Sequence, residues 1–218
     1  MMNDQVKSKK RVTDHGEVFT SKREVNAMLD LVKQETERID SRFLEPACGT
    51  GNFLVEILNR KLNVVRKRYS KNKLDYEKYA VVAISSIYGV DILEDNVIEC
   101  RNNIFSIFDE EYTKVCGKEA NDECRDAVKY IISRNVLHGN ALTMETQKGK
   151  PIIFSEWSLV SGDLIKRRDY RFDQLLAEPS PQLSIFNMDW EYDEEIQAFI
   201  PAPLKEYPLI NYRRVQYV

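Results

Sequence analysis

The chain has 218 residues, of which 43% are hydrophobic and 31% are charged, and this length suits one large domain or one domain with an appended segment. The composition excludes a wholly disordered chain, because enough apolar residues are present to form a core. The 32 Lys and Arg residues are outnumbered by 35 Asp and Glu, and the resulting net charge of −3 excludes a globally basic nucleic-acid binder.

The N-terminal residues and the cysteines bear on the cellular compartment. The first thirty residues lack the apolar stretch of a signal peptide, and no run approaches the ~18 apolar residues that cross a bilayer. The four cysteines are irregularly spaced and form no CxxC pair, so we expect reduced, buried thiols and no metal site. These features predict a cytoplasmic protein without a membrane partner.

Glycine and proline are unevenly distributed along the chain. All eight glycines lie at or before Gly162, whereas five of the seven prolines follow residue 178. We therefore predict a domain over residues 1–178, beginning with an N-terminal arm over residues 1–20, and a Pro-rich, aromatic C-terminal tail over residues 179–218.

Strand and helix patterns alternate along the body. Ser21 and Glu24 form a capping box that predicts a helix start. Three short apolar runs predict strands at 43–45, 87–92 and 136–138. Apolar residues at helical spacing predict helices over 53–65 and 97–108 and through 127–131. This order predicts an α/β fold with a doubly wound, mostly parallel sheet, and two later apolar runs around Gly162 predict a β-hairpin.

The carboxyl ends of the predicted strands should converge on one crevice. Gly49-x-Gly51, in the first of these loops, permits a sharp turn and a close ligand approach. Leu54 replaces the third glycine of a dinucleotide fingerprint, and the Gly-Lys-Ser/Thr ending of a phosphate loop is missing. A pyrophosphate is therefore disfavoured. A ligand with a ribose and a carboxylate is favoured, since helix amides after Gly51 could receive the carboxylate.

The interval from Gly49 to Asp91 is about twice the ~20 residues usual between a glycine loop and a ribose-binding acid. The stretch from Arg60 to Lys73 has seven basic residues and no acid. A lengthened helix end or an inserted loop in this stretch would explain why the interval is longer than usual. Two interpretations of this stretch stay open: a solvated surface, or a local patch that contacts the phosphates of DNA.

The segment Phe43–Leu54, with the sequence FLEPACGTGNFL, closely resembles the S-adenosylmethionine loop of bacterial N6-adenine DNA methyltransferases, the modification subunits of restriction systems. Three further segments resemble motifs of that family in the family's order: GEVFT at Gly16–Thr20, GVDI at Gly89–Ile92 and GNAL at Gly139–Leu142. The resemblance thus covers residues 16–142.

The resemblance implies a Rossmann-like methyltransferase fold, S-adenosyl-L-methionine as the cofactor and methyl transfer to adenine in DNA. The cofactor-binding residues that it implies are Phe19, Thr20, Glu45, Ala47, Gly49, Gly51, Asp91, Ile92, Asn140 and Ala141. Several of these have a plainer alternative. Phe19 could be a packing residue, Glu45 a surface acid, Asp91 a helix-initiating acid and Asn140 a turn former.

The family's catalytic tetrapeptide, Asn/Asp-Pro-Pro-Tyr/Phe, does not occur in this sequence. Such a loop holds an adenine that has been taken out of the duplex. Glu178-Pro179-Ser180-Pro181 lacks the aromatic residue, and Asn187 with Trp190 offers an amide and a ring without prolines. Asn187 and Trp190 are therefore the catalytic candidates, although a surface loop and a packed tryptophan are the default interpretations.

Three functions stay open at this point. The first is an active DNA methyltransferase, for which the short tail implies a specificity or partner subunit. The second is a cofactor-binding, catalytically silent homologue that acts as a regulatory or interaction subunit. The third is a Rossmann enzyme with another nucleoside cofactor, which Leu54 disfavours.

Overall fold

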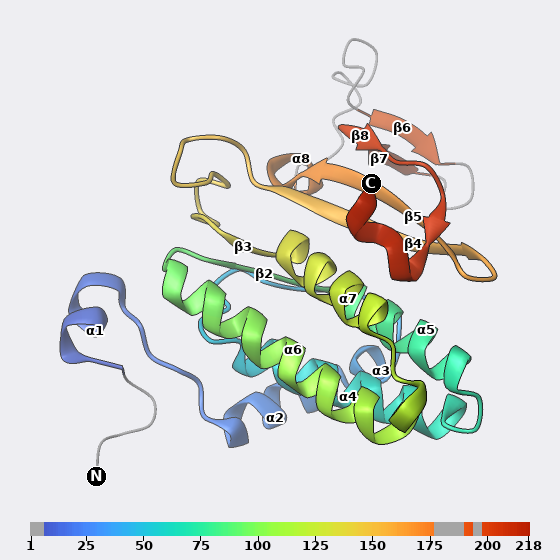
Figure 1. The fold of residues 1–218 in the computed structure, drawn as a ribbon. Helices are drawn as coiled ribbons and strands as arrows, with labels where there is room; N and C mark the ends of the chain where they lie inside the picture. The colour runs from blue at the N-terminus through green and yellow to red at the C-terminus, as the bar shows by residue number, and fades with distance from the viewer. Residues whose placement is uncertain (1–6, 177–189, 194–197) are drawn as a thin grey trace.

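A parallel three-stranded sheet lies at the centre of the computed structural model, which describes residues 7–176, 190–193 and 198–218 (Figure 1). The strands follow the order β1–β2–β3: Phe43–Glu45, Ile87–Asp91 and Val136–His138. In the register, Glu45 pairs with Gly89 and Asp91 with His138, so the three carboxyl ends meet at one edge. The predicted α/β fold with a Rossmann-like parallel sheet is confirmed.

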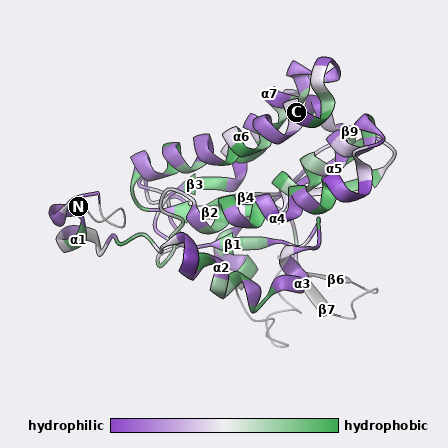
Figure 2. Cartoon of the chain, turned by 90° about the horizontal axis from the view of Figure 1, so that it is seen from below, coloured by the Kyte–Doolittle hydropathy of each residue, from purple (hydrophilic) through white to green (hydrophobic). Residues whose placement is uncertain are grey.

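Long helices cover one face of this sheet. They are α4 (Asn52–Tyr69), α5 (Lys73–Ser85), α6 (Glu94–Cys116) and α7 (Asp122–Asn135). Helix α4 buries Leu54, Ile57 and Leu58 at helical spacing, and hydrophobic and hydrophilic residues alternate along α4 and α6 in Figure 2, as expected for helices with one buried face. Helix α5 was not predicted, and together with the end of α4 it accounts for the long interval between the first two strands.

The predicted hairpin covers the other face of the sheet, where Figure 1 shows it opposite α4 and α6. It consists of β4 (Ile153–Ser161) and β5 (Leu164–Arg171), which pair antiparallel. Ile87 belongs to the helical side of the core, whereas its neighbour Tyr88 packs edge-on against Phe154 at 5.5 Å between ring centroids. The alternation of side chains along β2 therefore gives the sheet two buried faces, one under helices and one under β-structure.

Shorter elements complete the described structure. They are α1 (Lys9–His15), α2 (Lys22–Asp30), α3 (Lys33–Thr36), η1 (Gly117–Glu119), α8 (Phe172–Leu176), β6 (Trp190–Asp193), β7 (Ala198–Pro201), β8 (Lys205–Glu206), β9 (Ile210–Asn211) and η2 (Tyr212–Tyr217). The capping box at Ser21 and Glu24 is confirmed at the start of α2. In the described part of the chain, no helix is both long and apolar enough to span a bilayer.

The last residues of the chain pack on the body. Strands β8 and β9 both pair with β5, and the hydroxyl of Tyr212 donates to the buried carboxylate of Glu77 at 2.8 Å. Arg213 and Tyr112 also donate to Glu77. The predicted division of the chain at residue 178 stays a prediction, because residues 177–189 lie outside the described ranges.

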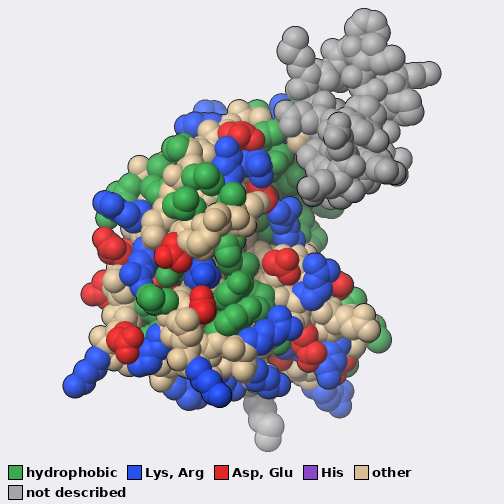
Figure 3. All heavy atoms as spheres, turned by 90° about the vertical axis from the view of Figure 1, so that its right-hand side faces the viewer, with side chains coloured by type: hydrophobic (Ala, Val, Ile, Leu, Met, Phe, Trp, Pro, Cys, Tyr) green, Lys and Arg blue, Asp and Glu red, His purple; other side chains and the backbone are tan. Residues whose placement is uncertain are grey.

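Most of the predicted basic stretch is used inside the fold. Arg60 pairs with Asp30, Arg66 with Glu111 and Lys73 with Glu119, while Lys67, Arg68 and Lys71 are exposed. In the hairpin, Lys166 and Arg168 pair with Glu206, and Arg167 with Asp169. Figure 3 likewise shows basic and acidic side chains interspersed on one face of the molecule. Contact between this stretch and DNA stays a prediction.

Lys61 is a buried exception among these basic residues, with 0% of its surface exposed. Its Nζ donates to Ser86 Oγ at 2.6 Å, to Ile39 O at 3.2 Å and to Ser41 O. The lysine thereby satisfies carbonyl groups of the segment that leads into β1. Burial lowers the pKa of Lys61 to about 7.

Replacing Lys61 by methionine should change how stability depends on pH. The folded pKa is about 7 and that of an unfolded lysine is ~10.4, so between these values the unfolded chain binds more protons. Lys61 should therefore contribute a rise in the unfolding free energy of the wild type, relative to Lys61→Met, from about pH 7 to about pH 9, by at most ~1.4 kcal/mol per pH unit. Lys61→Met should lack this rise. Urea unfolding across this range measures it, with Lys67→Met as the exposed control, and parallel profiles for Lys61→Met and wild type would contradict the prediction.

Candidate functional site

A cavity of about 730 Å³ opens where the three strands end. Its walls come from the arm, the β1–α4 loop, the β2–α6 loop and the turn after β3. All the predicted cofactor residues except Gly51 line it: Phe19, Thr20, Glu45, Ala47, Gly49, Asp91, Ile92, Asn140 and Ala141. Residues predicted from four separate motifs thus share one hollow, although their role in binding stays a prediction.

Asp91 holds the loops around the cavity together. Its Oδ2 accepts from the amide of Gly49 at 2.8 Å, and its Oδ1 accepts from the amide of Leu93 at 2.9 Å and from Asn96 Nδ2 at 3.3 Å. The carbonyl of Asp91 accepts from the amide of Gly139 at 3.0 Å. A carboxylate has about four lone-pair positions, so three protein donors leave little more than one for a ligand hydroxyl.

The glycine loop owes its shape to close approaches by two other segments. Gly49 has φ 52°, and a Cβ there would lie 3.2 Å from the ring of Phe19 in the arm. Gly51 has φ 94°, and its Cβ would lie 2.7 Å from Cys100 Sγ on α6. Gly51 therefore does not line the cavity, and its role is to allow α6 to pack closely beneath the loop. As the N-cap of α4 it provides no side-chain cap, so the first amides of α4 stay available to an anion.

The arm closes one side of the cavity with residues 16–20. Asn52 Nδ2 donates to the carbonyl of Thr20 at 3.0 Å, which joins the arm to the start of α4. The carboxylate of Glu17 is 7% exposed and accepts from Arg11 at 2.6 and 2.8 Å and from Asn96 at 2.7 Å. Although burial acts to raise it, these hydrogen bonds hold the pKa of Glu17 below its ordinary value.

The cavity is acidic. Glu17, Glu45 and Asp91 line it, and no lysine, arginine or histidine is among the described residues that do so. Burial raises the pKa of Glu45, whose Oε1 accepts a long hydrogen bond, 3.4 Å, from the amide of Ala47. Such a lining opposes a phosphate and suits a ligand that carries positive charge.

Asn140 forms a turn, which was the alternative to a role in ligand binding. Its Oδ1 accepts from the amide of Leu142 at 2.9 Å, as in an Asx-turn, and its backbone pairs with Glu145. The turn presents Asn140 and Ala141 to the cavity, so turn formation and ligand contact are compatible.

The role of the two catalytic candidates stays a prediction. Asn187 lies outside the described residues, and Trp190 is the first residue of β6. The cavity also contains side chains that the sequence did not single out: Glu17, Asn52, Phe53 and Asn96. Glu17 stood within the quoted GEVFT segment, whereas nothing in the sequence pattern marked Asn96.

Comparisons with known proteins agree with this geometry. A family model described as "RMKL-like, methyltransferase domain" matches residues 25–143. The chain is also similar to the Type II restriction enzyme and methyltransferase RM.Eco57I of Escherichia coli, with 22% identity over 181 residues. That alignment covers 77% of this chain but 17% of the relative, so the chain spans only a small part of that protein. No solved structure matches.

Alanine should be tolerated less well at Gly51 than at Gly149. Both glycines have positive φ, 94° and 68°, so alanine is strained at either position by ~1–3 kcal/mol. Only at Gly51 would the new Cβ meet an atom, Cys100 Sγ, whereas nothing lies within 4 Å at Gly149. Gly51→Ala should therefore lower the unfolding free energy by a further ~1–3 kcal/mol, measured by urea unfolding. Adding Cys100→Ala should recover part of that loss, and equal effects at the two glycines would contradict this account.

Proposed function

The chain belongs to the RMKL-like methyltransferase domain family, and from this premise we propose that its cavity binds S-adenosyl-L-methionine and that the protein transfers the methyl group to adenine in DNA. One observation carries the proposal: a cavity at the carboxyl ends of a parallel sheet whose described lining includes three acids and no basic side chain. DNA is the acceptor we favour because the similar protein is named a restriction enzyme and methyltransferase.

The cavity suits this cofactor in size and charge. Its volume of about 730 Å³ is within the range of small-molecule sites, ~300–1,000 Å³. The cofactor's sulfonium and ammonium groups match the carboxylates of Glu45 and Glu17, and its carboxylate matches the free amides at the start of α4. Asp91 retains a lone-pair position for a ribose hydroxyl, and the turn at Asn140 would meet the adenine edge. When bound, the cofactor supplies an already activated methyl group.

The protein's task is then to position an acceptor nitrogen and exclude water. Phe19 and Phe53 place aromatic rings at the cavity wall, and Thr20 and Asn52 place polar groups beside them. In the proposal, this wall faces the methyl group, since the cofactor's carboxylate would lie at the start of α4 next to Asn52 and Phe53. A flipped base could stack there.

The second candidate is a cofactor-binding homologue without methyltransferase activity. The sequence lacks the Asn/Asp-Pro-Pro-Tyr/Phe tetrapeptide, and this observation favours a regulatory or interaction subunit over an independent enzyme. Both candidates require the same cofactor, so they differ only in what happens to the methyl group.

Labelled S-adenosyl-L-methionine separates these functions. Calorimetric titration should first show binding to the intact protein, and failure to bind would reject both candidates. Transfer of label to adenine N6 in a mixed-sequence DNA supports the proposed enzyme. Binding without transfer to DNA or RNA supports the silent homologue, and transfer to RNA alone overturns the DNA assignment.

Asp91→Ala should weaken cofactor binding by ~1–3 kcal/mol, through loss of the hydrogen bond to the ribose and of the brace between the loops. Glu94→Ala is the matched control, because Glu94 is an exposed acid on the first turn of α6 and does not line the cavity. Calorimetry measures both affinities, with unfolding curves to verify that each variant is folded. An affinity for folded Asp91→Ala equal to that of the wild type removes Asp91 from the binding site.

The pH dependence of binding should trace to Glu45. The pKa of Glu45 is raised in the empty cavity, so at mildly acidic pH part of the protein holds a proton that a cationic ligand must displace. Affinity for S-adenosyl-L-methionine should therefore increase as the pH rises through the range just above ~4.3, the ordinary value for glutamate. Glu45→Gln should bind more weakly and lose this increase. In the empty wild type, the folded state binds the Glu45 proton more tightly than the unfolded chain does, so Glu45 lowers the unfolding free energy as the pH rises. The variant Glu45→Gln should lack this pH-dependent decrease.

Calorimetry in two buffers of different ionisation enthalpy counts the protons released on binding. The exposed acid Glu94 provides the control variant, Glu94→Gln. Proton release by Glu45→Gln equal to that of the wild type would assign the effect to another group.

A further inference from the structure

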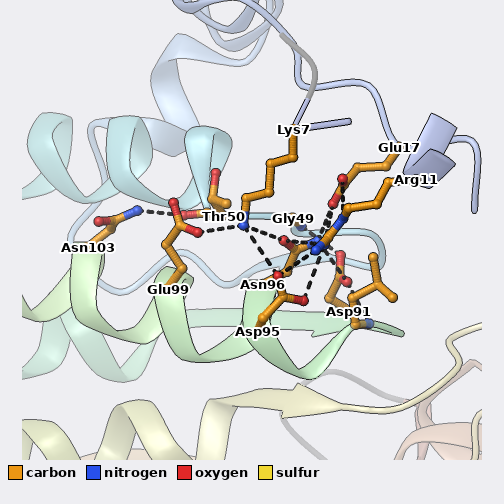
Figure 4. Close-up of polar contacts among 11 residues, drawn as sticks. Lys7, Arg11, Glu17, Gly49, Thr50, Asp91, Asp95, Asn96, Glu99 and Asn103 are labelled. Atoms are coloured by element: carbon orange, nitrogen blue, oxygen red, sulfur yellow. Dashed lines mark hydrogen bonds and ion pairs between the residues drawn. The ribbon is translucent and has the colours of Figure 1, made fainter. Parts of the chain in front are cut away.

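A single buried amide links the arm to the floor of the cavity. Asn96, on the first turn of α6, is 1% exposed. Its Nδ2 donates to Glu17 Oε1 at 2.7 Å and to Asp91 Oδ1 at 3.3 Å, so it joins two of the acids that line the cavity (Figure 4). Its Oδ1 accepts from Lys7 at 3.1 Å and from Arg11 at 3.0 Å. Both ends of this amide are therefore used, one toward the acids and one toward the bases of the arm.

Ion pairs connect the rest of the arm to the same helix. Arg11 pairs with Glu17 within the arm and with Asp95 on α6, where Nη1 and Oδ2 are 2.5 Å apart. Lys7 pairs with Glu99 one turn further along α6 at 2.6 Å. Figure 4 shows these side chains converging on Asn96 from the arm on one side and from α6 on the other.

Hydrophobic burial contributes little to this attachment. Helix α1 has no buried residue among those whose burial is described, whereas α2 buries Val25 and Leu29 against the core. Figure 1 accordingly shows α1 at the edge of the molecule, outside the helical layer. The Asp95 and Glu99 side chains are 56% and 46% exposed, and pairs this open to solvent are screened by salt. The arm is thus anchored by polar contacts that can be released without unfolding the core.

We infer that residues 7–20 form a strap that closes over the cofactor, and that Asn96 is the positioning residue that couples closure of the strap to the orientation of Asp91. This inference rests on the proposed function, because it assumes that the cavity binds the cofactor. Opening of the strap would then control exchange of the cofactor. Glu17 and Phe19 lie on the strap and line the cavity, so opening would remove an acid and a ring from the ligand. The neutral amide of Asn96 allows Glu17 and Asp91 to stay close while both carry negative charge.

The strap is tested first without any ligand, by hydrogen exchange of the intact protein. In Arg11→Gln, the amides of residues 9–18 should exchange ~10-fold faster than in the wild type, as expected for loss of a local anchor. Raising NaCl from ~50 mM to ~500 mM should accelerate wild-type exchange in the same segment and change Arg11→Gln little. Arg23→Gln makes the same charge change at an exposed position of α2 and should match the wild type. Equal exchange in Arg11→Gln and wild type overturns the strap.

The second measurement is the dissociation rate of S-adenosylhomocysteine, followed by rapid dilution into unlabelled ligand. Arg11→Gln and Asn96→Leu should release it ~5- to 10-fold faster than wild type, and salt should accelerate wild-type release but hardly affect Arg11→Gln. Arg11→Lys keeps the charge but not the forked geometry, so its release rate should lie between those of the wild type and Arg11→Gln. If Asn96 had a purely structural role, Asn96→Leu would lower the stability of the protein without changing the salt dependence of S-adenosylhomocysteine release.

The two proposals fail in different ways. If the wild type binds neither S-adenosyl-L-methionine nor S-adenosylhomocysteine, the proposed function is rejected, and with it the role of the strap in exchange. If the wild type binds but Arg11→Gln and Asn96→Leu release the ligand at the wild-type rate, only the strap is rejected. Asn96→Leu is interpreted only where its unfolding curve shows a folded protein, and Arg11→Gln, at a partly exposed position, provides the independent variant.

Discussion

The carboxylate of Asp91 is the contact on which the rest of the site depends. It lies at the end of the central strand and accepts hydrogen bonds from the amide of Gly49 in the β1–α4 loop and from the amide of Leu93 in its own β2–α6 loop. Backbone amides at two loop ends would otherwise need water or a ligand as acceptors. One acid therefore joins two of the loops around the cavity, and the same acid lines the cavity. Support of the loops and contact with a ligand are combined in a single side chain.

Charge distribution explains how so acidic a cavity is tolerated. Glu17 is neutralised by Arg11, Asp91 is satisfied by amides, and Glu45 is protonated more readily than usual because it is buried. Arg11 does not line the cavity, and among the described residues that do, the charged ones are all acids. This arrangement favours a cationic nucleoside over a nucleotide, and the family assignment of the chain is in accord with it.

Local sequence signals predicted the elements that surround the site, because each signal acts over a few residues. Glycines with a flanking apolar run marked the β1–α4 turn, and the capping box at Ser21 marked the start of α2. Helix α5 was missed because its apolar residues do not mark its buried face: the run Ala80–Ile84 is apolar without a break, and the buried residues include the polar Glu77 and Ser85. Asn96 was missed for another reason: an asparagine on a charged helical turn is unremarkable until the arm folds back onto it.

The sequence by itself determined the α/β class, the parallel order of the strands and which loops gather at their carboxyl ends, since these follow from residue periodicity and from the handedness of crossovers. The tertiary structure alone decided that the hairpin covers the second face, that Gly51 accommodates Cys100, and that Arg60, Arg66 and Lys73 of the basic stretch form ion pairs with other segments. Each of these depends on contacts between segments far apart in the chain. Such contacts are set by packing and charge pairing in three dimensions, which no local pattern encodes.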